Sequence, residues 1–238
     1  MRPLSELHVK IFADGADLDR IAELTCNPLI KGFTTNPTLM RAAGVVDYEP
    51  FARRVLERTG DRPISFEVFA DDFAEMERQA RLISAWGPSI YVKIPISNTS
   101  GASSERLLRR LAAQGVRVNV TALLTVDQVR LAADCLAGGP HSFVSVFAGR
   151  IADTGRDPIP PMREALDALA PHSHLELIWA SPREVLNVVQ ADDIGCDVIT
   201  VTHDLLKKLP TLGRDLTELS LDTVRMFHRD ASAAGYTL

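Results

Sequence analysis

The sequence contains few cysteines and no spacing typical of a metal site. Its 238 residues include three cysteines, Cys26, Cys135 and Cys196, which are odd in number, widely separated and free of any CxxC pair. This usage is typical of reduced thiols in a cytoplasmic protein rather than of disulfides or a zinc site. The six histidines show no HExxH or comparable ligand spacing, so the sequence gives no support to metal catalysis.

Long apolar runs and an excess of positive charge are also missing. No stretch reaches the roughly 18 consecutive apolar residues that a membrane-spanning helix needs, and residues 1–12 lack the apolar core of a secretory signal. The net charge of -5 gives no long-range attraction to nucleic acid or to an anionic membrane. We therefore expect a cytoplasmic protein that binds neither nucleic acid nor membranes.

The sequence does have the composition of a globular protein. Hydrophobic residues make up 46% of the chain and charged residues 24%. This length is sufficient for one large barrel or two modest domains. No low-complexity segment or linker interrupts the chain, which favours a single domain over residues 1–238.

Short apolar runs alternate with amphipathic stretches along the chain. Within residues 74–86, for example, Met76, Ala80 and Ile83 fall on one helical face, and residues 101–113 show a similar pattern. The expected strands are residues 8–13, 30–34, 63–69, 89–94, 116–121, 142–147, 174–180 and 197–201. This alternation predicts a parallel sheet whose strands are joined by right-handed crossovers.

Eight such units predict an α/β fold of the closed (β/α)8 barrel type. A doubly wound open sheet is the alternative, but no GxGxxG motif follows the first strand. After the last unit, residues 213–234 predict a long amphipathic helix with Leu216, Leu219, Met226 and Phe227 toward one side. This helix would pack on its own barrel or on a neighbouring subunit.

One predicted strand carries a lysine where an apolar residue is expected. Lys93 lies within YVKIP, residues 91–95, behind a run of β-branched and aromatic side chains. Burial would disfavour its charged form and lower its pKa from about 10.4 toward neutrality. A partly unprotonated amine can attack a carbonyl and form a Schiff base. Alternatively, Lys93 extends past the strand end or pairs with a carboxylate.

Further polar residues gather where the other predicted strands end. The carboxyl ends of barrel strands form one mouth, which is where the chemistry of such barrels takes place. Because buried polar groups are costly unless they are satisfied, their convergence at one mouth indicates a site. The residues concerned are Asp14, Asn36, Glu67, Lys93, Asn119, Thr121, Ser145, Phe147, Arg150, Ser181 and Arg183.

Several of these residues also have a structural explanation. Asp14 could cap the helix that follows it, and Asn36 precedes a proline, as in many turns. Arg150 and Arg183 could be surface arginines in salt bridges. Glu67 is harder to explain in this way, because an unpaired carboxylate inside a strand is expensive.

Six segments, taken together, resemble the transaldolase family over nearly the whole chain. They are IFADGAD (11–17), GFTTNPTLM (32–40), YVKIP (91–95), NVTALL (119–124), SVFAGRI (145–151) and WASPRE (179–184). The short chain is similar to the small-subunit branch, which includes fructose 6-phosphate aldolases. The resemblance implies sugar phosphate substrates, a homo-oligomer, a place in the pentose phosphate pathway of carbohydrate metabolism, and no metal or organic cofactor.

The resemblance also implies a catalytic role for four residues. Lys93 would attack the C2 carbonyl of a ketose phosphate and form an imine. Asp14 would take the proton from the C4 hydroxyl as the C3–C4 bond breaks. Glu67 and Thr121 would hold a water that shuttles protons while the imine forms and is released.

The remaining matching residues would bind substrate. Asn36 and Asn119 would hydrogen-bond the hydroxyls of the three-carbon unit, and Ser181 would orient its terminal hydroxyl. Arg150 and Arg183 would bind the phosphate through forked, charge-assisted hydrogen bonds. Ser145 and Phe147 complete the substrate-binding set.

Two positions favour transfer of the three-carbon unit over its release. Glu67 and Phe147 match transaldolases, whereas fructose 6-phosphate aldolases typically have glutamine and tyrosine there. Two departures, Gly15 in place of a hydroxyl residue and Pro182 in place of an aromatic residue, leave open an unusual anionic sugar as substrate. The alternatives are a lyase that releases free dihydroxyacetone and a non-catalytic barrel that binds sugar phosphates or serves as a scaffold.

Overall fold

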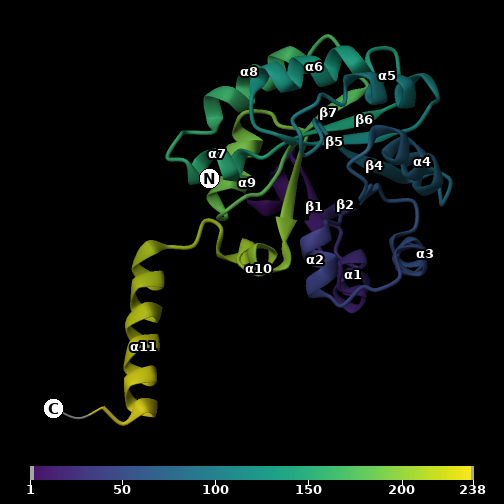
Figure 1. Ribbon diagram of the computed structural model, residues 1–238. Coiled ribbons are helices and arrows are strands. Elements are labelled where there is room, and N and C mark those ends of the chain that lie inside the picture. The colour runs from purple at the N-terminus through teal and green to yellow at the C-terminus, as the bar shows by residue number, and fades with distance from the viewer. Residues whose placement is uncertain (1–2, 237–238) are drawn as a thin grey trace.

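The computed structural model, which describes residues 3–236, contains a closed parallel barrel (Figure 1). Each strand pairs with the next in chain order, and the last pairs with the first. The strands are β1 (Lys10–Asp14), β2 (Ile30–Thr34), β3 (Ile64–Glu67), β4 (Ile90–Pro95), β5 (Val118–Leu123), β6 (Ser142–Val146), β7 (Leu175–Trp179) and β8 (Val198–Thr202). The predicted (β/α)8 barrel is therefore confirmed, and the open sheet is wrong.

All helices except the C-terminal one surround the barrel because each buries apolar side chains on the face toward it; in α5, Leu107, Leu108 and Leu111 fill that face. The helices are α1 (Leu18–Thr25), α2 (Pro37–Ala42), α3 (Tyr48–Thr59), α4 (Phe73–Ser84), α5 (Glu105–Ala113), α6 (Val126–Leu136), α7 (Ala148–Asp153), α8 (Ile159–Leu169), α9 (Leu186–Asp193), α10 (His203–Leu206) and α11 (Leu216–Ala234), with 3-10 turns at Leu4–Glu6 and Leu209–Thr211. Among the residues described, no helix is both long and apolar enough to cross a membrane.

The helix predicted over residues 101–113 begins later than expected, at Glu105. The side chain of Asn98 accepts hydrogen bonds from the backbone N–H groups of Ser100 and Ala102, at 3.2 and 2.9 Å. Asparagine competes with helical hydrogen bonding in this way and favours a turn. Residues 101–104 therefore lie outside the helix, although the sequence pattern predicted them within it.

The C-terminal helix α11 stands apart from the barrel (Figure 1). It begins at Leu216 rather than at residue 213, because the Asp215 side chain caps the first turn. None of its residues is buried, and Leu216 and Phe227 are 77% and 63% exposed. Of the two packing arrangements that the sequence allowed, packing on its own barrel is therefore wrong.

Side chains fill the barrel interior in layers. A middle layer of apolar residues includes Phe12 and Phe143, whose rings meet edge to face with centroids 5.5 Å apart. At the amino ends of the strands, the Glu176 carboxylate bridges Lys10 and His141. The apolar layer separates this ion network from the polar mouth at the carboxyl ends.

Two seams of the barrel are paired over a short length. β2 pairs with β3 at Phe33–Ile64 and Thr34–Ser65, and β7 pairs with β8 at Ile178–Val198 and Trp179–Ile199. The other neighbouring strands are paired over longer stretches, as between β6 and β7. The short β2–β3 seam lies directly below the candidate site.

Candidate active site

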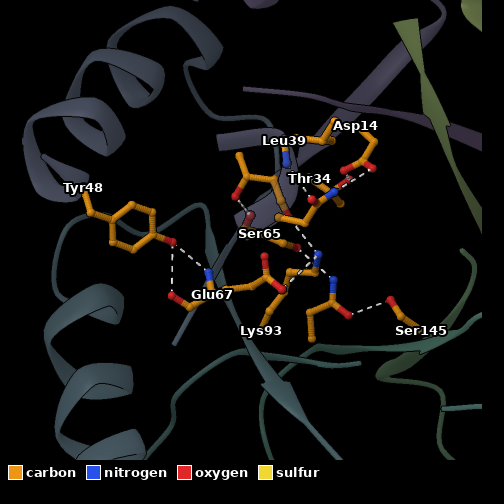
Figure 2. Close-up of polar contacts among 11 residues, drawn as sticks. Asp14, Thr34, Leu39, Tyr48, Ser65, Glu67, Lys93 and Ser145 are labelled. Carbon is orange, nitrogen blue, oxygen red and sulfur yellow. Dashed lines mark hydrogen bonds and ion pairs between the residues drawn. The ribbon is translucent and has the colours of Figure 1, made fainter. Parts of the chain in front are cut away.

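The side chain of Lys93 lies inside the mouth of the barrel, as the sequence predicts. Lys93 is 8% exposed, and its Nζ donates to the backbone oxygen of Thr35 at 2.7 Å. The same Nζ lies 3.8 Å from Oε1 of Glu67, and Figure 2 marks this ion pair with a dashed line. Lys93 therefore does not extend past the strand end, and its amine is held between a carbonyl and a carboxylate.

Glu67 ends β3 and stands opposite Lys93 in the strand register. Burial raises the pKa of Glu67 to about 7, with the Lys93 charge opposing the rise and the Asp14 charge adding to it. Its Oε2 and Oγ1 of Thr121 are both buried without a hydrogen-bond partner among the described residues. Two such oxygens at one mouth are suited to a bridging water.

The Asp14 carboxylate accepts two side-chain hydrogen bonds at the end of β1. Thr34 donates to Oδ1 at 2.7 Å, and Asn36 donates from Nδ2 to Oδ2 at 3.2 Å. Burial raises the pKa of Asp14, while the Lys93 charge and these two hydrogen bonds oppose the rise. Asp17, not Asp14, caps the following helix, so the helix-cap explanation for Asp14 is wrong.

Asn36 combines its structural and its candidate functional role. Its Oδ1 accepts from the backbone N–H of Leu39 at 2.9 Å and so caps α2, while its Nδ2 donates to Asp14. The cap fixes which way the amide faces. Asn36 is therefore held in an orientation that presents a donor to the mouth.

A chain of hydrogen bonds connects three strands behind Lys93. Asn119 is fully buried; its Nδ2 donates to Oγ of Ser65 at 3.0 Å, and its Oδ1 accepts from Ser145 at 2.7 Å. Ser65 was not among the predicted residues. Its signal was its position two residues before Glu67, which places both side chains on one face of the strand.

The two arginines expected to bind phosphate lie on neighbouring segments. Arg150 is on α7 with its guanidinium 5.2 Å from the ring centroid of Phe147. Arg183, in the β7–α9 loop, donates from Nε to both carboxylate oxygens of Asp153, at 3.0 and 3.1 Å. These bonds hold the pKa of Asp153 below its usual range. Nη2 of Arg183 also donates to Oδ2 of Asp153, so the salt-bridge explanation applies to Arg183, and its Nη1 has no partner among the described residues.

A close backbone contact holds these segments together. A Cβ added at Gly149 would lie 1.6 Å from the backbone oxygen of Ser181, so only glycine allows α7 to approach the β7–α9 loop this closely. Ser181 has a left-handed φ of 62°, which costs energy in a residue other than glycine. Pro182 is buried directly behind it.

Gly15 leaves open space beside Asp14. A Cβ built at Gly15 would meet no atom within 4 Å. A hollow of about 320 Å³ adjoins it, and Asp14, Phe33, Leu39 and Thr202 contribute to its lining, whereas Lys93 does not. A Cβ at position 15 would therefore lie in open space and clash with none of the groups that hydrogen-bond Asp14.

Within residues 3–236 the structure has no group of three or more His, Cys, Asp or Glu side chains that could hold a metal ion. The polar groups at the mouth are instead one amine, two carboxylates, amides and hydroxyls. Such a set can carry out nucleophilic attack and proton transfer.

Comparison with known proteins matches this chain to one family. The model of the transaldolase/fructose-6-phosphate aldolase family matches residues 11–238. A "Probable transaldolase" of Chelativorans sp. (strain BNC1) is 36% identical over 90% of this chain and 94% of its own. Another of Dehalococcoides mccartyi is 33% identical over 84% of this chain and 90% of its own.

The similarity of this chain to solved structures supports the fold alone. A crystal structure from Burkholderia cenocepacia J2315 superposes with a TM-score of 0.62, covering 90% of this chain and 86% of its own at 12% identity. The family match and the curated relatives each cover far more than half of the sequence, and the family match includes every residue placed above at the barrel mouth. The chain belongs to the transaldolase/fructose-6-phosphate aldolase family.

Proposed function

We propose that the protein is a class I transaldolase, which transfers a dihydroxyacetone unit from a ketose phosphate to an aldose phosphate through an imine on Lys93. The observation that carries this proposal is the buried Lys93 amine, held 2.7 Å from the Thr35 carbonyl and 3.8 Å from the Glu67 carboxylate. An amine in this position can attack a carbonyl carbon, with a carboxylate at hand for proton transfer.

The first half of the reaction forms and breaks bonds at C2 and C4. The Lys93 amine adds to the C2 carbonyl, and a water bridging Glu67 and Thr121 carries protons as the carbinolamine loses water. The pKa of Glu67, about 7, suits it to give and take a proton near neutral pH. Asp14 then takes the C4 hydroxyl proton, the C3–C4 bond breaks, and the aldehyde leaves with an enamine remaining on Lys93.

The second half reverses these bonds on another aldehyde. The enamine carbon attacks the acceptor carbonyl, Asp14 returns its proton to the new hydroxyl, and hydrolysis releases the product. Asn36, Asn119 and Ser145, with Ser181, bind the hydroxyls of the three-carbon unit. Arg150 and Arg183 bind the phosphate, with the Arg183 edge that is not bound to Asp153 available for this purpose.

Trapping with borohydride tests the proposal. Incubating the wild-type protein with fructose 6-phosphate and borohydride should leave a reduced three-carbon adduct on Lys93, found by intact mass and peptide mapping. If other ketose phosphates label Lys93 and fructose 6-phosphate does not, the donor is a different sugar. If no ketose phosphate labels it, the enzymatic function is wrong.

Phe147 is one of the two residues that favour transfer over release. Phe147→Tyr should raise the ratio of free dihydroxyacetone to transfer product by roughly tenfold, because a tyrosine hydroxyl can donate a proton to the enamine. Coupled assays of both products measure this ratio. Phe73→Tyr, which adds a hydroxyl at a half-buried site on α4, is the control. An unchanged ratio in Phe147→Tyr would remove the reason for preferring transaldolase over aldolase at this position.

We also propose that the protein is a homo-oligomer in the cytoplasm. The three cysteines are unpaired thiols, which supports a reducing compartment. The apolar face of α11 is uncovered in the single chain, and large exposed apolar patches are typical of interfaces. Leu216→Asp combined with Phe227→Asp should lower the mass found by sedimentation. Arg229→Asp on the polar face should not, and equal masses for both proteins would contradict the oligomer.

A further inference from the structure

The ladder between β2 and β3 is interrupted beside the candidate nucleophile. The backbone N–H of Thr35, the residue just after β2, donates to the backbone oxygen of Ser65 at 3.2 Å. In a regular parallel ladder, the residue whose N–H donates to the backbone oxygen of residue 65 also accepts, at its own backbone oxygen, from the N–H of residue 67. The next bond would therefore run from the Glu67 N–H to the Thr35 oxygen.

The two groups that would form this bond, the Glu67 N–H and the Thr35 backbone oxygen, both have other partners. The Thr35 oxygen accepts from Nζ of Lys93 at 2.7 Å. The backbone N–H of Glu67 donates to the Tyr48 hydroxyl at 2.8 Å, and that hydroxyl donates to the backbone oxygen of Glu67 at 3.1 Å (Figure 2). One tyrosine hydroxyl thus satisfies both main-chain groups of Glu67, within the one donor and two acceptor sites that it has.

Tyr48 is firmly held where it makes these bonds. It begins α3, and its ring packs edge to face against Phe66, Phe69 and Trp86, with centroids 6.0, 4.5 and 5.5 Å away. Burial raises the pKa of the Tyr48 hydroxyl well above its usual range, so it stays protonated and can donate. The hydroxyl therefore reaches the sheet from a helix outside the barrel.

We propose that Tyr48 is a positioning residue: it replaces the Thr35 carbonyl as the partner of the Glu67 N–H and so leaves that carbonyl free to hold Lys93. One hydroxyl would fix two groups of the site, the carboxylate at the end of β3 and the amine on β4. This inference rests on the proposed roles of Lys93 and Glu67.

Tyr48→Phe tests the inference because it removes the hydroxyl and keeps the ring. The Glu67 N–H would then pair with the Thr35 carbonyl in competition with Lys93. We expect kcat to fall by about tenfold to a hundredfold, the loss typical of a small displacement of reacting groups, while KM for the ketose phosphate changes little. The rate of borohydride trapping on Lys93 should fall in parallel.

Tyr91→Phe is the matched control. Tyr91 also lies in the barrel, but its hydroxyl is 2.9 Å from Nδ1 of His141, in the interior ion network at the opposite end. Its loss should leave kcat and trapping near wild-type values. Equal kinetics in the two variants, or a change in KM alone for Tyr48→Phe, would overturn the positioning role.

A crystal structure of the Tyr48→Phe protein gives a readout that does not depend on turnover. We expect the Glu67 nitrogen within hydrogen-bond distance of the Thr35 oxygen and Lys93 displaced from it. An unchanged Lys93–Thr35 bond would overturn the inference. If the wild-type protein is never labelled on Lys93, the proposed function fails, whereas this structural result still decides the role of Tyr48.

Discussion

Lys93→Ala will form no adduct with any ketose phosphate, and its turnover will fall by about 10⁴-fold or more, as when other covalent nucleophiles are removed. Among residues 3–236, Lys93 is the one whose amine contacts both the Thr35 carbonyl and the Glu67 carboxylate, so no other described amine can replace it. The substitution also removes the positive charge that opposes the burial-induced rise in the pKa of Glu67, so this pKa will rise above about 7. Intact mass after borohydride treatment and a coupled transfer assay measure the two effects.

Lys31→Ala is the control for this prediction. Lys31 is an exposed lysine on β2 whose Nζ donates to the oxygen of Pro28, away from the mouth. It should keep wild-type turnover, and both variants should show the circular dichroism of the folded barrel. Turnover of folded Lys93→Ala near the wild-type rate would rule out the imine.

Gly149→Ala will destabilise the protein and weaken its binding of phosphorylated substrates. Its methyl group would lie 1.6 Å from the Ser181 oxygen, a backbone atom that cannot rotate away. Overpacking of this kind costs about 3 kcal/mol, which corresponds to a fall in Tm of about 6–12 °C for a chain of this size. Separation of α7 from the β7–α9 loop also moves Arg150 away from Arg183, so KM for the ketose phosphate should rise by about tenfold or more.

Gly87→Ala provides the comparison. Its added Cβ would meet the nearest atoms, on Leu56, at 3.8 Å, which is an ordinary contact. Thermal unfolding and initial rates over a range of substrate concentrations measure both variants. If Gly149→Ala matched Gly87→Ala in Tm and in KM, the close contact would have no part in holding the phosphate end.

The barrel could be predicted from the sequence because every strand is a short apolar run that the structure keeps nearly in place. The polar residues at the strand ends were equally visible, since Glu67 and Lys93 interrupt runs in which apolar side chains are expected. Asn36 shows the limit of such reasoning. It was considered either a turn residue or a site residue, and it is both a helix cap and a donor to Asp14.

Other parts of the site had no local signal. Tyr48 lies in a helix 19 residues before Glu67, and only the packing of α3 against β3 brings its hydroxyl to that strand end. Asp153 follows Arg150 by three residues, yet it binds Arg183, which is 30 residues away. Contacts between distant segments depend on tertiary packing, and periodicity within a single sequence does not report them.

The two short seams, β2–β3 and β7–β8, divide the barrel into two arcs. Asp14 and Asn36 belong to the arc of β8, β1 and β2, whereas Lys93 and Glu67 belong to the arc from β3 to β7. Segments with fewer backbone hydrogen bonds between them open at lower free energy. Motion of one arc relative to the other would therefore change the distance between Asp14 and Lys93. The hydrogen bond from Lys93 to the Thr35 oxygen crosses the β2–β3 seam and would restrain this motion.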